Sequence, residues 1–551
     1  MDLKPHLIEE LVRIVGRERF SMEPALRDHW ARTTLPQEGA RPVAVIQPAS
    51  REEVQQIVRV AAANTLSLYP ISTGKNWGYG DACAPVPGCL LIDLSGMNRI
   101  LEVNIELAYA VVEPGVTQGQ LSTHLEKTHT PLMMDCTGAG PDTSLIGNTL
   151  ERGFGHSPYG DRFACSCNYE VVLPDGSLIT TGFGGYPNAR AQHLYKWGVG
   201  PSLDGLLTQS NLGIVTRMTI WLMPQPESIE YFFVSLKTPE AIGGLVEALR
   251  RLRLQGTVRS TVHCFNERRL LAGRTRYPWN EMNGTQALEK QRPELVQRLC
   301  RELALPSWGA SGILLGSRQE TAAARRKIKK ELSHLSGLDR LIFLNEKRFQ
   351  WSTRLARGFQ WAKRVARSLR LPVPFHSLSQ HLALVRLGMD LLTGRPSYET
   401  LKGSHWRARQ DPDRTEDPLT SGSGLIWFSP VLPMTEQAVR DFTILVEPIF
   451  HEFGFEYQMA LSCSTDRALC AIMSICFDKH SLEETARAEK CGEKLLGVLL
   501  TQGYVPYRGS PMVMEQVRKQ APAYWKAVAQ LKQAWDSQNI IAPGRYIPGG
   551  P

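Results

Sequence analysis

Three glycines and one lysine stand at the end of an apolar run, in the stretch YPISTGKNWGYG at residues 69–80. A glycine-rich turn after a strand can bring backbone N–H groups close to a phosphate. A nucleoside-triphosphate loop needs glycine five residues before the Gly-Lys pair and Ser or Thr directly after it, but these positions hold Tyr69 and Asn76. The glycine spacing also differs from a G-x-G-x-x-G dinucleotide fingerprint. The stretch is therefore either a plain tight turn or a cradle for another pyrophosphate.

A second glycine-rich region, DCTGAGPDTSLIGNTLERGFGHSPYGDR, spans residues 135–162. Backbone that passes through so many glycines can approach a ligand closely. The two clusters follow strands that are distant in the chain, which suggests that both line one extended groove. A long cofactor needs such a groove.

Length and composition describe an ordinary globular protein. The chain has 551 residues, which predicts two or three domains, and its 42% hydrophobic and 21% charged content argues against disorder. The net charge of +9 is spread along the chain, so composition does not favour a nucleic-acid partner.

The eleven cysteines are an odd number, without a C-x-x-C pair or a Cys/His spacing that indicates a metal site. The first twenty residues form an amphipathic pattern and not an apolar signal peptide, so we expect reduced thiols in a cytoplasmic protein. No apolar run approaches the roughly 20 residues of a spanning helix, and no transmembrane segment is expected.

Strands and helices alternate from Arg41 onward, which indicates a layered α/β region. A helix begins at Ser50 with a capping box, in which Ser50 accepts from the Glu53 amide and Glu53 reaches back. The other expected elements are strands at 41–48, 66–72, 89–94, 108–115 and 213–226, a helix that opens at Thr117, and a hairpin at 169–182.

After Pro226 the pattern changes to helices among isolated strands such as 424–432 and 470–478, which predicts a second, α+β domain. Two basic stretches lie in it, at 321–335 and 354–370. We interpret them as solvated helix faces; an acidic partner or a membrane surface is the alternative.

Six motifs in order carry a resemblance to a known family: PISTGKNWGYG, VEPGVT, IGNTLERGFGHSPYGD, GVGPSLDGLLTQSNLGIVT, GYVPYR and IIAPGR. With them the chain resembles the vanillyl-alcohol oxidase and 4-cresol dehydrogenase flavoproteins over most of residues 41–226 and 500–551, and more thinly between. The resemblance implies an α+β fold with a two-part FAD-binding domain, residues 1–226 and 500–551. Residues 227–499 would be an inserted α+β cap over the flavin, and the protein a possible homodimer.

The resemblance also assigns cofactor contacts, and it identifies the opening turn as the pyrophosphate cradle. Ser72, Thr73, Gly74, Lys75 and Asn76 would line the pyrophosphate of FAD, Gly140, Pro141, Asp142, Thr143, Ser144, Gly147, Asn148, Gly153 and His156 the flavin side, and Ile214 and Val215 the adenine side. Arg545 would lie near the flavin, where positive charge stabilises the reduced anionic ring.

Relatives take hydride from the benzylic carbon of a para-alkyl phenol and form a quinone methide. This chemistry needs a phenolate, and a phenol with a pKa near 10 ionises at neutral pH only beside cations and hydrogen-bond donors. The family uses two tyrosines and an arginine, which match Tyr79, Tyr507 and Arg508 here. Arg508 would supply the charge and the two hydroxyls the remaining donors.

The chain departs from the family at its acid–base positions. The loop that carries an aspartate beside the flavin in oxidase relatives is one residue longer here; Asp142 could substitute for it, or cap the loop. A cap strand that offers histidines or a glutamate in relatives supplies Ala460 and Cys470, and Cys470 reads as a small buried hydrophobe. The step that traps the quinone methide therefore stays open.

We expect FAD without a covalent tether. The family's tethering histidine and tyrosine fall on Leu425 and near Asp417, which are not the expected partners of the flavin methyl group. His156, Tyr159 and Cys136 lie in the flavin-lining region and are the possible substitutes.

Two rival functions remain. One is an oxidase of hydroxy acids or sugars with the same fold, in which Tyr79 and Tyr507 would have no phenolate to hold. The other is a flavin-binding protein with degenerate catalysis and a partner-binding role. The electron acceptor, O₂ or a redox protein such as a cytochrome, is not decided by the sequence.

Overall fold

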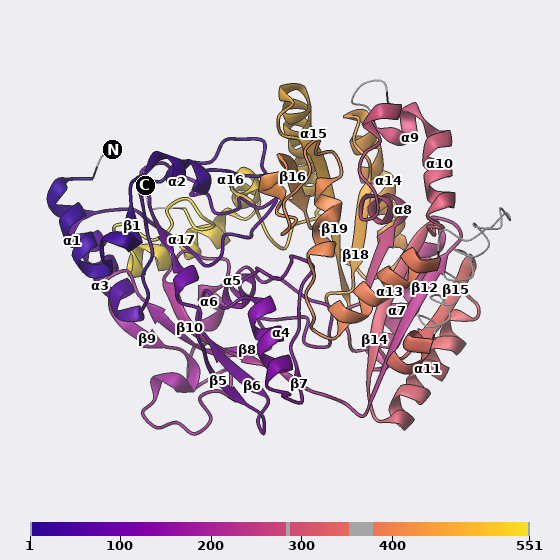
Figure 1. Cartoon of the computed structure of the whole chain (residues 1–551), viewed down its shortest axis with the longest axis horizontal. Coiled ribbons are helices and arrows are strands. Elements are labelled where there is room, and N and C mark those ends of the chain that lie inside the picture. Colours follow the sequence, from indigo (N-terminus) through magenta and orange to yellow (C-terminus); the bar gives the residue numbers. More distant parts are fainter. Residues whose placement is uncertain (1–2, 283–286, 352–377, 549–551) are drawn as a thin grey trace, which may run out of the picture.

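The N-terminal part of the chain, indigo in Figure 1, forms a four-stranded sheet with the order β1–β2–β4–β3, in which β2, β4 and β3 are parallel and β1 pairs antiparallel with β2. The computed structural model describes residues 3–282, 287–351 and 378–548. Its first elements are α1 (Pro5–Val15), β1 (Phe20–Ser21), α2 (Pro24–Trp30), β2 (Ala44–Ile46), α3 (Arg51–Asn64), β3 (Leu68–Ile71) and β4 (Leu90–Asp93). Strand β2 leads through α3 to β3, and both run parallel to β4, so the predicted alternation is confirmed.

The start of α3 confirms half of the predicted capping box. Ser50 Oγ accepts from the Glu53 amide at 3.2 Å. The Glu53 carboxylate does not close the box on Ser50, because it accepts from the Ala49 amide at 2.9 Å and pairs with Arg19 at 2.7 Å. A guanidinium is a stronger partner than a second amide, so tertiary contact decided this local geometry.

A second, antiparallel sheet has the order β5–β6–β10–β8–β9. The elements of this region are β5 (Ile100–Asn104), β6 (Tyr109–Val112), α4 (Gln118–Lys127), β7 (Leu132–Met133), α5 (Leu145–Leu150), β8 (Ser166–Val172), β9 (Leu178–Thr180), α6 (Asp204–Leu207), β10 (Ile214–Trp221) and β11 (Met223–Pro224). The predicted hairpin is confirmed, because β8 pairs with β9 across a turn in which Gly176 has φ +78°. Thr117 caps α4, as predicted.

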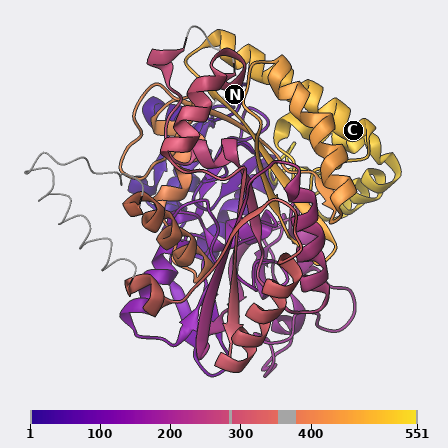
Figure 2. The same ribbon diagram turned by 90° about the vertical axis from the view of Figure 1, so that its right-hand side faces the viewer.

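The middle of the chain builds a large antiparallel sheet, ordered β15–β12–β14–β13–β18–β19–β16, with β17 also on β19; Figure 2 turns this part toward the viewer. Its elements are β12 (Ser228–Leu236), α7 (Ala241–Leu254), β13 (His263–Asn266), α8 (Glu267–Ala272), α9 (Leu288–Gln291), α10 (Pro293–Glu302), β14 (Trp308–Gly316), α11 (Arg318–Leu332), β15 (Leu338–Leu344), α13 (Leu378–Leu392), β16 (Ser423–Phe428), β17 (Val431–Pro433), α14 (Glu436–Glu452), β18 (Gln458–Ser462), β19 (Ala468–Asp478) and α15 (Leu482–Thr501). The strands predicted as isolated are instead neighbours in this sheet. Pairing partners distant in sequence give no local signal, which is why that expectation was wrong.

Strand β16 separates a core face from a cavity face. Leu425, Trp427 and Ser429, the last just beyond the strand, line one cavity. Ile426 and Phe428 between them pack into the apolar core with residues of α7, α14 and α15. This alternation is the two-residue period of a strand.

The end of the chain returns to the first sheet, where its yellow ribbon lies among the indigo and purple elements in Figure 1. Helices α16 (Pro511–Gln520) and α17 (Pro522–Trp535) precede this return. The Leu68 amide donates to Ile540 O at 2.7 Å, and the Ala542 amide donates to Leu68 O at 2.7 Å. The predicted division at residues 226 and 499 stays a prediction.

The remaining expectations concern cysteines and charge. All eleven cysteines are free, and Cys470 is buried, as predicted. In α11 the side chains of Arg326, Lys327 and Lys329 are exposed, which confirms a solvated face. The basic stretch 354–370 lies outside the described residues. In the described ranges, no helix combines the length and apolarity that crossing a membrane requires.

Candidate active site

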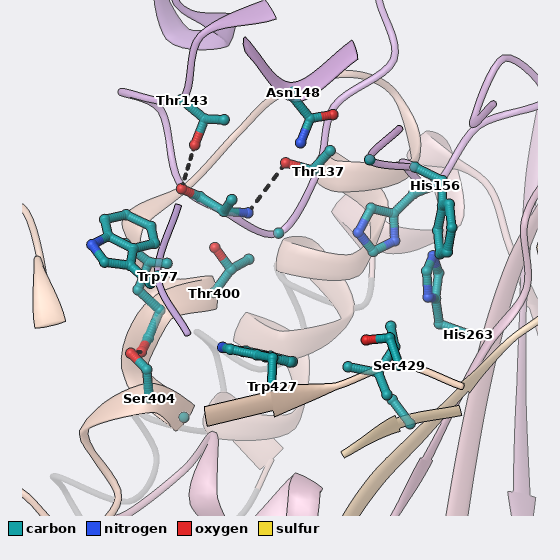
Figure 3. Close-up of a pocket in the computed structure, with 18 of the residues that line it drawn as sticks. Trp77, Thr137, Thr143, Asn148, His156, His263, Thr400, Ser404, Trp427 and Ser429 are labelled. Atoms are coloured by element: carbon teal, nitrogen blue, oxygen red, sulfur yellow. Dashed lines mark hydrogen bonds between the residues drawn. The ribbon is translucent and has the colours of Figure 1, made fainter. Parts of the chain in front are cut away.

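A cavity of about 1230 Å³ lies between the two halves of the molecule. Figure 3 shows Thr137, Thr143 and Asn148 on one side of it, and Trp427 and Ser429 on the other. The structure brings most predicted site residues to its lining: Ser72, Thr73, Gly74, Lys75, Asn76, Tyr79, Thr143, Ser144, Gly147, Asn148, Gly153, His156, Ile214, Val215, Tyr507, Arg508 and Arg545. Segments from both ends and the middle of the chain therefore share one site.

The glycine turn after β3 presents unpaired donors to this cavity. Gly74 and Gly78 have φ +69° and +72°, and a Cβ at Gly78 would lie 1.8 Å from Trp427 Cδ1. Among the described residues, the backbone N–H groups of 73–76 have no acceptor. Successive free N–H groups form an anion-binding concavity, which fits the pyrophosphate of FAD.

The second glycine region closes around the same space. A Cβ at Gly147 would lie 2.3 Å from Ser72 Oγ, and one at Gly153 would lie 2.4 Å from Asn148 Nδ2. Asn148 Oδ1 is buried without a hydrogen-bond partner in the described part of the chain. A buried acceptor left unpaired on a cavity wall fits a ligand that donates to it.

Three predicted contacts are not brought to the lining: Gly140, Pro141 and Asp142. The Gly140 carbonyl accepts from Gln118 Nε2, and the Pro141 carbonyl from the Gly119 amide at 2.8 Å. Asp142 accepts from the Tyr398 hydroxyl at 3.0 Å. These bonds fix the loop to α4 and to the cap from behind the lining.

Lys75 links the two halves of the molecule. Its Nζ lies 2.5 Å from Asp417 Oδ2, and Trp77 Nε1 donates to the same carboxylate at 3.2 Å. The predicted pyrophosphate lysine therefore also holds the cap against the glycine turn.

Tyr79, Tyr507 and Arg508 converge on one wall. The Arg508 guanidinium lies 4.2 Å from the centre of the Tyr79 ring, and the Tyr79 hydroxyl is 2.6 Å from Ser429 Oγ. Tyr507 packs on Phe154, with ring centres 4.9 Å apart. Burial raises the pKa of Tyr79 to about 12 and that of Tyr507 well above its ordinary value, so both hydroxyls stay protonated.

Glu151 joins the two arginines and was missed by the sequence analysis. Arg508 Nε donates to it at 3.0 Å and Arg545 Nη2 at 3.1 Å, and the Tyr546 hydroxyl donates as well. Burial would raise its pKa, but Arg545 and Arg508 outweigh burial and hold the pKa at about 2. The available signal was a carboxylate inside a cofactor-lining motif, TLERGFG.

Two histidines face each other beside this wall (Figure 3). The rings of His156 and His263 lie 4.2 Å apart. His263 Nε2 donates to Gly155 O at 3.3 Å, so its Nδ1 accepts from Ser462 Oγ at 2.7 Å. Burial lowers the pKa of both, that of His156 to about 4, and both are neutral at pH 7. His263 stands alone on a cap strand, and nothing in its local sequence identified it.

Arg269 of α8 also lines the cavity and was not predicted. Its guanidinium lies 4.7 Å from the Trp427 ring centre, and Nη1 donates to Ser474 Oγ at 3.1 Å. No carboxylate among the described residues pairs with it. Burial lowers its pKa, although an arginine remains charged.

Of the three substitutes for a flavin tether, His156 lines the cavity, whereas Cys136 and Tyr159 are not part of the lining. Leu425, at the family's histidine position, does line it and has no nucleophilic atom. We expect acid precipitation to leave the yellow colour in the supernatant, with the mass of free FAD. A yellow pellet, or protein heavier by one FAD, would contradict this expectation and point to His156.

One family model and two similar proteins show which known proteins this chain resembles. A family model described as an FAD binding domain matches residues 42–182. A 1'-carboxy-chondrochloren decarboxylase of Chondromyces crocatus is 36% identical over 503 residues, which cover 91% of this chain and 90% of that protein. The hydroxylating 4-cresol dehydrogenase flavoprotein subunit of Pseudomonas putida is 28% identical over 546 residues, which cover 98% of this chain and 94% of that protein.

Two solved structures are similar over nearly the whole chain. A crystal structure of p-cresol methylhydroxylase with substrate bound has a TM-score of 0.85 at 25% identity and covers 99% of this chain and 96% of that one. The 4-ethylphenol oxidase from Gulosibacter chungangensis, in complex with isoeugenol, has a TM-score of 0.86 at 25% identity and covers 99% and 97%.

Proposed function

Because this chain belongs to the vanillyl-alcohol oxidase and p-cresol methylhydroxylase family of FAD-linked oxidoreductases, we propose that it oxidises a para-alkyl phenol at the benzylic carbon. The observation that carries the proposal is the convergence of Tyr79, Tyr507 and Arg508 on the cavity. An oxidase of hydroxy acids or sugars has no use for two protonated tyrosines beside a buried cation. A degenerate flavin protein does not need them either.

The chain's own groups would hold FAD in two places. The free N–H groups of 73–76 would bind the pyrophosphate, and Asn148 Oδ1 would accept a hydrogen bond from the flavin side. When bound, FAD accepts the hydride that leaves the benzylic carbon. Arg545, buried beside Glu151, adds positive charge to this end of the cavity.

Arg508 and the two tyrosines stabilise the phenolate. The guanidinium supplies the cation, and the hydroxyls, protonated because burial raises their pKa, donate hydrogen bonds to the substrate oxygen. The anionic oxygen then pushes electrons through the ring toward the departing hydride. Preorganised donors of this kind act strongly in a site from which water is excluded.

A neutral histidine can then accept the proton of a water that adds to the quinone methide. Among the described residues neither ring nitrogen of His156 has a hydrogen-bond partner, whereas both nitrogens of His263 are bonded. His156 is therefore the proposed base, oriented by the ring of His263. The electron acceptor, O₂ or a redox protein, and a homodimeric assembly stay predictions.

The test is anaerobic bleaching of the flavin absorbance of the purified protein. We expect a para-alkyl phenol to bleach it, and lactate and glucose to leave it unchanged. Bleaching by a hydroxy acid or a sugar alone would favour the oxidase alternative. No bleaching by any of these compounds would favour the degenerate flavin protein.

Tyr79→Phe should slow this reduction only mildly. It deletes one neutral donor worth about 1 kcal/mol, roughly fivefold in rate, and leaves Arg508 in place. Stopped-flow reduction of the variant by the same phenol measures the effect. A loss larger than that of an Arg508 variant would reverse the ranking of the two groups.

A second candidate function, oxidation coupled to loss of CO₂, is favoured by Arg269, a cavity cation without a carboxylate partner among the described residues. The relative that is 36% identical is named a decarboxylase of a carboxy compound. If the carbon next to the benzylic position carries a carboxylate, hydride loss gives a quinone methide that can break the C–CO₂⁻ bond. The bond's electron pair forms the new C=C and restores the phenolate, so the products are CO₂ and a vinylphenol. One CO₂ per flavin reduced is the expected stoichiometry.

A further inference from the structure

We propose that Arg269 binds a carboxylate on the side chain of the phenolic substrate, and that the natural substrate is therefore an anionic, not a neutral, para-alkyl phenol. The inference rests on the proposed phenol oxidation and deepens it. It concerns the part of the cavity lined by α8 and β16, where sequence analysis identified no charged group.

Helix α8 holds Arg269 in a fixed position. The Asn266 side chain caps the helix by accepting from the Arg269 amide at 2.9 Å. Its Oδ1 also accepts from the Met459 amide at 3.1 Å, and its Nδ2 donates to Tyr457 O at 2.7 Å. The first turn of α8 is thereby fastened to β18, and a residue on this turn is preorganised for binding.

The guanidinium itself is held on two sides. One face lies 4.7 Å from the Trp427 ring centre, and Nη1 donates to Ser474 Oγ at 3.1 Å. Ser474, which is opposite Trp427 in the β16–β19 ladder, donates in turn to Gln458 Oε1 at 3.2 Å. These contacts orient the planar guanidinium group of Arg269, but none of them neutralises its charge.

Several cavity charges have partners of opposite sign, and Arg269 has none among the described residues. Lys75 pairs with Asp417, Arg508 with Glu151, and Glu399 with Lys402. No carboxylate in the described part of the chain is paired with Arg269 or with Arg274, which also lines the cavity. A partly desolvated guanidinium without a counterion is costly, and a bidentate carboxylate is its best partner.

The distance to the phenolate end suits a short side chain. Ser429 contacts the Tyr79 hydroxyl. Trp427, whose ring packs against the Arg269 guanidinium, is two residues earlier on the same face of the strand. Their Cα atoms are therefore about 7 Å apart. A phenol whose oxygen lies at Tyr79 and whose para chain runs along β16 brings its carboxylate to Arg269.

The experiment compares two probes of the same shape, para-hydroxyphenylpropanoate and the neutral para-hydroxyphenylpropanol. Their dissociation constants are measured by calorimetry on the FAD-loaded, chemically reduced protein, so neither probe is oxidised. We expect the carboxylate to bind at least about tenfold tighter than the alcohol. Arg269→Gln should abolish this ratio, and Arg269→Lys should keep part of it, because a point charge lacks the bidentate fork.

The matched control is Arg268→Gln, the neighbouring arginine, which pairs with Glu267 at 2.6 Å and does not belong to the cavity lining. It should keep the full ratio. Equal binding of the two probes by the unaltered protein, or a ratio that survives Arg269→Gln, overturns the role of Arg269 while phenol oxidation stands. If Arg269→Gln does not fold, an undiminished ratio in Arg269→Lys overturns it. If neither probe binds and no para-alkyl phenol bleaches the flavin, the proposed function fails, and this inference fails with it.

Discussion

Arg508→Ala is expected to give a folded protein that retains FAD and that phenols reduce at least about 100-fold more slowly. The variant loses the only charge that we assign to the phenolate oxygen, so the bound phenol returns toward its solution pKa. Transition-state stabilisation by one preorganised donor is worth about 3 to 4 kcal/mol, which sets the size of the effect. The rate constant for anaerobic flavin reduction, measured by stopped flow, checks it.

Two further variants show whether the charge itself is responsible. Arg508→Lys keeps the cation and should fall between the unaltered protein and Arg508→Ala, whereas Arg13→Ala, an exposed arginine on α1, should change nothing. The pH optimum of flavin reduction should also move in the Arg508→Ala variant, toward the pH at which the free phenol ionises. Unchanged reduction kinetics in Arg508→Ala would remove the phenolate assignment.

Glu151→Gln is expected to have the largest effect on stability, a loss of about 3 kcal/mol in the free energy of unfolding. The carboxylate is the shared partner of Arg508 and Arg545, and the substitution leaves two buried guanidinium groups without their shared negative charge. Urea denaturation at pH 7, with the exposed Glu9→Gln on α1 as control, measures the difference. An unchanged midpoint would contradict the view that this cluster holds both ends of the chain together.

The pH dependence of that difference follows from the pKa of Glu151. The two arginines hold its folded-state pKa at about 2, below the ordinary value of 4.5. A lowered folded-state pKa adds stability above the unfolded value, and this stability is lost as the pH falls through the folded one. The gap between the unaltered protein and Glu151→Gln should therefore be constant from pH 5 to 8 and shrink from about pH 4.5 toward 2.

The FAD-binding half was predictable because its signals are local. The glycine turn, the hairpin at 169–182 and the cap at Thr117 each depend on residues close in sequence, and the structure has all three. Tyr79, Tyr507 and Arg508 could be singled out because they stand in recognisable motifs, and the structure places all three on the cavity lining. In all these cases the residue type and its neighbours determine the geometry.

The cap half was predicted less well because its geometry depends on distant pairing. Strands β16 and β19 are distant in the sequence but pair in the sheet. Their register puts Trp427 opposite Ser474, and Arg269 contacts both residues. Glu151 and His263 take their roles from partners far along the chain, Arg508 and His156. The sequence around a carboxylate or an imidazole does not indicate which arginine or ring will contact it in the folded protein.

The seam between β3 and residues 540–542 decides when a growing chain can acquire its cofactor. A ribosome delivers the N-terminus first, so the first sheet has an open edge at Leu68 until Ile540 and Ala542 emerge and pair with it. The glycine turn that would hold pyrophosphate begins directly after this strand. Tyr507, whose amide donates to Ser429 O at 3.1 Å, also arrives late. FAD loading should therefore wait for residues 540–542, and a nascent chain stalled before residue 540 should bind none.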